Sequence, residues 1–104
     1  MNTDLAVKAK FFKGLSDSTR LAILFCLGDQ EKTVGEIVEL TEATQSNISN
    51  HLKCLVECGL VKNRREGKNV FYSLRDHNVR ELLKTSEEVM SDVYSHIEAC
   101  LNYK

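Results

Sequence analysis

The apolar residues of this chain change their spacing twice, and that change constrains the fold more than any other feature. Through residue 58 they recur every three or four residues, as in amphipathic helices. Residues 61–74 instead place β-branched and aromatic residues on either side of Glu66-Gly67-Lys68-Asn69, which is typical of a hairpin. Helical spacing then returns after Asp76 and continues to Leu101. The predicted fold is mainly α with one small β-hairpin.

Capping residues divide the helical part into separate helices. A first amphipathic helix is predicted at about 5–15, and Thr33 and Glu36 form a T-x-x-E capping box that opens a short helix ending near Leu40. Polar caps and glycines set the other boundaries: Ser16 or Asp17 and Gly28 around the second helix, Thr44 and Gly59 around a helix at about 44–58, and Asp76 before a final helix at about 77–101. No proline or linker interrupts them, so residues 1–104 are predicted to form a single domain.

This order of elements is that of a winged helix-turn-helix. The short turn TEAT separates the third and fourth helices, and in this geometry the fourth helix enters the DNA major groove with its N-terminal residues leading. Short amide and hydroxyl side chains suit base edges and phosphates, and cations suit phosphates. The predicted DNA contacts are Gln45, Ser46, Asn47, Ser49, Asn50, His51 and Lys53 on the recognition helix (44–58), and Arg64, Arg65 and Lys68 on the wing (61–74).

Charge and composition agree with a protein that meets nucleic acid with one surface. The net charge is −1, but residues 53–75 are mainly basic and the chain after Asp76 is mainly acidic. A solvated mixed-charge surface explains this gradient equally well. No secretory signal or apolar run of membrane-spanning length is present, which predicts a cytoplasmic protein whose four cysteines are thiols. No nucleophile–base pair or phosphate-cradling loop appears, so we expect no enzyme and no small-molecule substrate.

The final helix carries an apolar stripe that is too long for a core of this size. Its members include Leu82, Val89, Val93, Ile97 and Leu101. A second copy of the chain is the expected cover, which predicts a homodimer built on the N- and C-terminal helices.

Two thiols stand one helical turn apart on the recognition helix. At about 100° per residue, Cys54 and Cys58 share an outward stripe with Asn47 and His51, opposite the apolar face that begins at Ile48. Their spacing lets both sulfurs reach one ion. Both cysteines could instead be small buried hydrophobes, which is also the expected role of Cys26.

Three segments carry a resemblance to a known family. SDSTRLAIL, TQSNISNHLKCL and GLVKNRREGKNVFYSL resemble the ArsR/SmtB family of bacterial metal-responsive repressors. The resemblance implies a homodimer that binds operator DNA when metal-free and releases it when metal binds. HLKCLVECGLV matches the pattern HLxCLxxCGLV of the cadmium- and lead-sensing CmtR branch, whereas two other branch sites are broken: GEIVEL has no cysteine, and Asn78, Val89 and Asp92 replace other expected ligands.

The CmtR-like resemblance implies a third ligand from the C-terminal region of the other subunit, where Cys100 is the candidate. A core or dimer-contact role remains the alternative for Cys100, and His96 could compete with it. Three sulfurs favour a large soft ion, so cadmium or lead is the expected inducer. Zinc is less favoured because it usually takes four ligands.

Two alternatives from other classes stay open. Cys54 and Cys58 could oxidise, which would make the protein a thiol-based redox-sensing repressor. The chain could also be a protein-interaction module, or a small enzyme, that only shares the fold.

Overall fold

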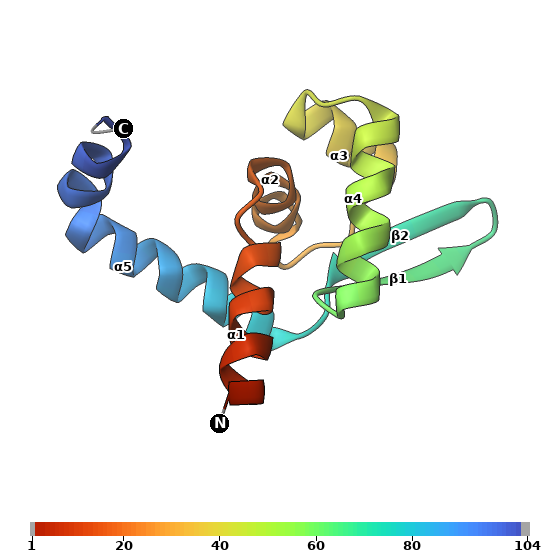
Figure 1. The fold of residues 1–104 in the computed structure, drawn as a ribbon. Helices are drawn as coiled ribbons and strands as arrows, with labels where there is room; N and C mark the ends of the chain where they lie inside the picture. Colours follow the sequence, from red (N-terminus) through yellow and green to blue (C-terminus); the bar gives the residue numbers. More distant parts are fainter. Residues whose placement is uncertain (1, 103–104) are drawn as a thin grey trace.

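The computed structural model describes residues 2–102 and has the predicted order of elements (Figure 1). Four helices precede a two-stranded antiparallel hairpin, and a long helix follows it. The elements are α1 (Asn2–Gly14), α2 (Ser18–Leu27), α3 (Val34–Thr41), α4 (Gln45–Cys58), β1 (Val61–Glu66), β2 (Asn69–Leu74) and α5 (His77–Asn102). The fold class is therefore confirmed; α1 begins three residues earlier than predicted and ends at Gly14 instead of Leu15.

The helix boundaries follow from side chains that satisfy otherwise unpaired backbone groups. Asp17, and not Ser16, caps α2, and the capping box of Thr33 and Glu36 is complete. Thr44 accepts the backbone N–H of Asn47 at 3.2 Å, and Asp76 accepts that of Val79 at 3.2 Å. These caps confirm the sequence predictions, because each one is a local hydrogen bond that its residue type favours.

Gly59 ends α4 in the left-handed conformation, with φ of 83°. Its N–H bonds the carbonyl of Val56 at 3.0 Å, and the N–H of Leu60 bonds the carbonyl of Leu55 at 3.0 Å. An L side chain is strained at this φ, so glycine is the favoured residue. The cap leaves only Gly59 and Leu60 between α4 and β1.

The hydrophobic core lies where α2, α3 and α4 meet. Ile23 and Leu24 of α2, Ile37 of α3 and Ile48 of α4 have no exposed surface. The remaining buried residues from these helices are Leu27, Leu52 and Leu55, and the hairpin and α5 add Val61, Leu74, Val79 and Leu83. Burying these side chains fixes α4 on its apolar stripe, so its polar residues face away from the core.

The hairpin is held to the helical body at its base. Val61 pairs with Leu74, and Arg64 pairs with Phe71. On the other edge of β2, Tyr72 exchanges two backbone hydrogen bonds with Lys32, at 2.8 and 2.9 Å. Lys32 precedes the N-cap of α3, so the wing is connected to both helices of the helix-turn-helix.

Helix α5 extends away from the core after its first turns (Figure 1). Val79 and Leu83 are buried, but Val89, Met90 and Tyr94 are exposed, and Val93 departs from helical φ/ψ. Helix α1 also exposes apolar residues, including Leu5 and Phe12. Apolar surface on both terminal helices agrees with the predicted dimer, because a second copy can cover it. None of the helices within residues 2–102 combines the length and apolar character needed to cross a bilayer.

Candidate metal site and nucleic-acid interface

The first turns of α4 present a row of polar side chains to solvent. Helix α3 and the turn through Glu42, whose φ is 59°, set the direction in which α4 leaves the core. The predicted base and phosphate contacts on this surface are all exposed: Gln45, Ser46, Asn47, Ser49, Asn50 and Lys53. Their DNA contacts stay a prediction, but the structure leaves all six accessible to a duplex.

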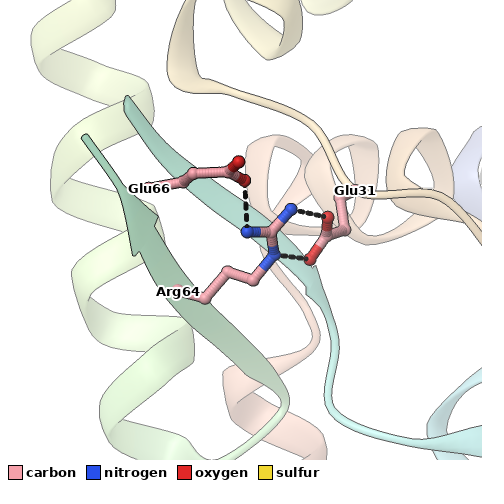
Figure 2. A network of polar contacts seen from close by, with 3 residues as sticks. All are labelled: Glu31, Arg64 and Glu66. Carbon is pink, nitrogen blue, oxygen red and sulfur yellow. Dashed lines mark hydrogen bonds and ion pairs between the residues drawn. The ribbon is translucent and has the colours of Figure 1, made fainter. Parts of the chain in front are cut away.

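On the wing, the predicted phosphate-binding residues divide into two kinds. Arg65 and Lys68 are exposed. Arg64 is held in an ion-pair network, which Figure 2 shows. Its Nε and Nη2 donate to the two carboxylate oxygens of Glu31 at 2.7 and 2.8 Å, and its Nη1 donates to Glu66 at 2.7 Å.

The electrostatics of this network follow from its geometry. The hydrogen bond from Arg64 lowers the pKa of Glu31, and the hydrogen bonds to Glu31 and Glu66 raise the pKa of Arg64. The guanidinium also lies 4.8 Å from the centre of the Phe71 ring. Three of its nitrogens are thus bonded to carboxylates, so a phosphate would compete with this network for Arg64, and the phosphate contact stays a prediction.

Cys54 and Cys58 lie outside the core cluster, as their helical positions predicted. Cys54 is half-buried and Cys58 is exposed. Both line a recess of 260 Å³ between α4 and α1, and its other lining residues are mainly apolar: Val7, Lys10, Phe11, Gly14, Arg20, Leu55 and Leu60. The expectation that these thiols continue the DNA-reading surface stays a prediction; the structure adds that both line a recess that α1 also lines.

A second recess shares the two thiols and is richer in positive charge. It measures 720 Å³, and Lys10, Lys13 and Arg20 line it together with Cys54 and Cys58. The two recesses have both sulfur-bearing residues in common. The thiols therefore border a space that is apolar on one side and cationic on the other.

Arg20 links the thiol recess to the recognition helix. Its Nη1 donates to the carbonyl of Gly14 at 2.9 Å, and its Nε donates to Nδ1 of His51 at 3.3 Å. Nε2 of His51 lies 3.8 Å from a carboxylate oxygen of Asp17. Both ring nitrogens of His51 thus face the start of α2, so His51 joins α4 to α2, and its DNA contact stays a prediction.

Replacing Asp17 with Ala is expected to lower the free energy of unfolding at neutral pH, because its carboxylate accepts the backbone N–H of Arg20 at 2.9 Å. That hydrogen bond lowers the pKa of Asp17 most, and the charges of His51 and Arg20 lower it further. A lowered pKa stabilises the fold above the unfolded-state value of about 3.9. The stabilisation is lost as the pH falls through the folded-state pKa. Urea titrations at neutral pH and at a pH below the folded-state pKa of Asp17 measure the difference in the free energy of unfolding between variant and wild type. A difference that does not depend on pH would contradict this account.

The other two cysteines and His96 have different outcomes. Cys26 is half-buried against the core and burial raises the pKa of its thiol, which confirms its packing role. The side chain of Cys100 lies outside the described part of the structure, so its ligand role stays a prediction. His96 is exposed. Among the residues that the structure describes, no three His, Cys, Asp or Glu side chains gather as a metal site.

Sequence reasoning missed three contributors to this surface. Arg20 reaches His51, which is 31 positions away, and Glu31 reaches Arg64, which is 33 positions away. The recess that Cys54 and Cys58 share with α1 was also missed. Helical spacing groups residues on one stripe but does not say which helix packs there.

A helix-turn-helix formed by α3 and α4, followed directly by a hairpin wing, defines a winged helix-turn-helix DNA-binding regulator. A family model described as "Bacterial regulatory protein, arsR family" matches residues 17–63, which include α2, α3, α4 and the start of β1. The chain belongs to the arsR family of bacterial regulatory proteins. Proteins of this family are transcriptional regulators and not enzymes, as predicted.

Curated relatives in this family are described as metal-resistance regulators. The chain is 38% identical over 92 residues to a "Probable mercury resistance operon repressor" of Streptomyces lividans, an alignment that covers 88% of this chain and 74% of that protein. It is 40% identical over 77 residues to a "Cadmium resistance transcriptional regulatory protein CadC homolog" of Staphylococcus aureus, covering 73% of this chain and 64% of that protein. The chain thus spans less than two thirds of the staphylococcal relative.

Solved structures support the same fold. The crystal structure of Rv0081 from Mycobacterium tuberculosis superposes with a TM-score of 0.82 at 33% identity, covering 88% of this chain and 93% of that chain. The solution structure of a homodimeric winged helix-turn-helix DNA-binding domain from Mycobacterium bovis gives a TM-score of 0.80 at 29% identity, covering 91% and 88%. The second protein is described as a homodimer.

Proposed function

We propose that this chain is a metal-responsive repressor that binds operator DNA as a metal-free homodimer and releases it when a soft heavy-metal ion binds. The observation that carries the proposal is the pair Cys54 and Cys58, one turn apart, outside the core and opening on the same recess. Thiolates select soft ions over magnesium or calcium. Relatives named for mercury and cadmium resistance support a heavy-metal inducer, and we propose cadmium or lead.

The residues around the recess fit such an ion. Two cysteine thiolates supply soft ligands, and a third thiolate would complete a three-sulfur shell whose charge with a divalent ion is negative. Lys10, Lys13 and Arg20 line the same recess and compensate that charge. We assign the third thiolate to Cys100 of the partner subunit, since the described part of one chain gathers no set of three ligands.

The position of the recess explains how metal and DNA compete in this proposal. Its walls are α1, a terminal helix with exposed apolar residues, and α4, the recognition helix. Tying α4 to the dimer helices changes the spacing of the two recognition helices, which must suit major grooves about 34 Å apart. By linkage, operator DNA then weakens metal binding by the same factor as metal weakens operator binding.

Subunit mixing tests whether the site is shared between two chains. A heterodimer is prepared from one Cys54→Ser/Cys58→Ser subunit and one Cys100→Ser subunit. If Cys100 ligates across the dimer, one complete site is rebuilt, and the heterodimer takes up half the cadmium of wild type with the ultraviolet absorption of thiolate-to-metal charge transfer. Each homodimeric variant serves as a control and is expected to lack a complete site. A heterodimer no better than the two parent variants would contradict a shared site.

Oxidation of the thiol pair is the alternative, and an assay of operator release distinguishes it from metal sensing. Cys58 is exposed and one turn from Cys54, so the pair is accessible to an oxidant. Operator release by peroxide, together with no release by cadmium or lead, would favour a redox sensor over a metal sensor.

A further inference from the structure

The two faces of the wing have different surroundings. Side chains alternate between the faces of a strand, so Arg64 and Arg65 point to opposite sides of the hairpin. Asn63 and Tyr72, which are register partners, line a recess together with residues of α4. Arg65 shares the face of Asn63 and therefore lies on the side of the recognition helix, whereas Arg64 lies on the other side.

The face that carries Arg64 is turned to the loop between α2 and α3, whereas the buried Val61 and Leu74 share the face of Asn63. Glu66 follows Arg64 by two residues on the same face, and Phe71 lies directly opposite it in the pairing register. Beyond them stands Glu31, whose carboxylate takes two hydrogen bonds from the guanidinium, as Figure 2 shows. The paired bonds fix both the distance and the orientation of Arg64.

Glu31 itself is held in place by its neighbour in the chain. Lys32 exchanges backbone hydrogen bonds of 2.9 and 2.8 Å with Tyr72 of β2. The backbone next to Glu31 is therefore fixed relative to the hairpin. Arg64 connects the middle of β1 to this point, and its other carboxylate partner, Glu66, lies next to the turn.

We infer that Arg64, which Glu66 holds on its own strand, is a positioning residue that sets the angle of the wing through Glu31, and that Arg65 on the opposite face is the phosphate contact. The inference rests on the proposed operator binding but not on metal sensing. If Arg64 acts in this way, Glu31 favours the binding of DNA although Glu31 is itself acidic. Electrostatics alone predicts the reverse, because removing a negative charge near DNA strengthens binding.

The test measures metal-free operator affinity by fluorescence anisotropy, on a duplex selected by the wild-type protein from a random pool. Glu31→Gln is expected to weaken binding about two- to five-fold, the change that coupling in an exposed ion pair allows. Arg64→Lys is expected to weaken it similarly, because lysine keeps the charge but lacks the planar fork. Arg80→Lys is the matched control and is expected to retain wild-type affinity, because Arg80 pairs with a carboxylate of Asp29 at 3.3 Å outside the predicted DNA contacts.

Salt dependence and thermal unfolding provide the second readout. Arg65→Ala is expected to reduce the slope of log affinity against log salt by about 0.9, the effect of one lost phosphate contact. Tighter or unchanged binding by Glu31→Gln would overturn the inference, as would equal losses in Arg64→Lys and Arg80→Lys. A Glu31→Gln affinity loss explained by partial unfolding at the assay temperature would overturn it too. Failure of the wild-type protein to select any duplex would instead sink the proposed function.

Discussion

Substituting Cys54 with Ser is expected to abolish the release of operator DNA by cadmium while leaving metal-free operator binding nearly unchanged. In the wild-type protein we expect cadmium to weaken operator binding between about 5- and 150-fold, the usual range of allosteric coupling. Serine removes one of the two thiolates that line the α1–α4 recess and leaves only two sulfurs of the proposed three-sulfur shell. Anisotropy titrations of labelled operator with and without cadmium measure both quantities.

Cys26→Ala is the matched control for this experiment. Cys26 is also a thiol, but it packs half-buried against the core from α2, away from the recess lining. Its replacement is expected to leave cadmium-driven release intact. Undiminished release in Cys54→Ser would remove the proposed site, and loss of release in Cys26→Ala would place the metal elsewhere.

Truncating Leu52 to Ala is expected to lower the free energy of unfolding by about 2–5 kcal/mol, the cost of a buried leucine cavity. Leu52 is 1% exposed and packs from the middle of α4 into the core of α2 and α3. The total stability of a small domain is about 5–15 kcal/mol, so the loss is a large fraction. Urea denaturation at fixed protomer concentration measures it, since dimerisation couples stability to concentration.

Leu40→Ala is the matched control, because it makes the same chemical change at a position that does not pack into the core. Leu40 lies on α3 and is 60% exposed. We expect this variant to stay within about 0.5 kcal/mol of wild type. Similar losses in the two variants would mean that α4 is not seated on the core through Leu52.

Local signals predicted the elements of the fold well. The capping box of Thr33 and Glu36, the cap at Thr44 and the glycine at position 59 each act within four residues, so their residue types determine the helix boundaries. The period change after Gly59 likewise identified both strands, because β1 and β2 are joined by a two-residue turn. Tertiary packing did not need to override any of these preferences.

The environment of the site depends on contacts that no local pattern contains. Spacing showed that Cys54 shares a stripe with His51, but not that α1 lines the same recess as the thiol or that Arg20 binds the imidazole. It also showed two adjacent arginines on the wing without showing that one of them meets Glu31. Such pairings depend on how the helices and the hairpin pack together, and they join residues that lie more than 30 positions apart in the sequence.

The short connection at Gly59 has a consequence for how the protein leaves DNA. Leu60 bonds back to Leu55 in α4, and its carbonyl accepts the N–H of Arg75 just after β2 at 3.0 Å. The recognition helix and the wing are thus joined through the same two residues, Gly59 and Leu60, so we expect a displacement of one to move the other. We therefore expect the recognition helix and the wing to dissociate from DNA together. An intermediate that stays bound through the wing alone is not expected.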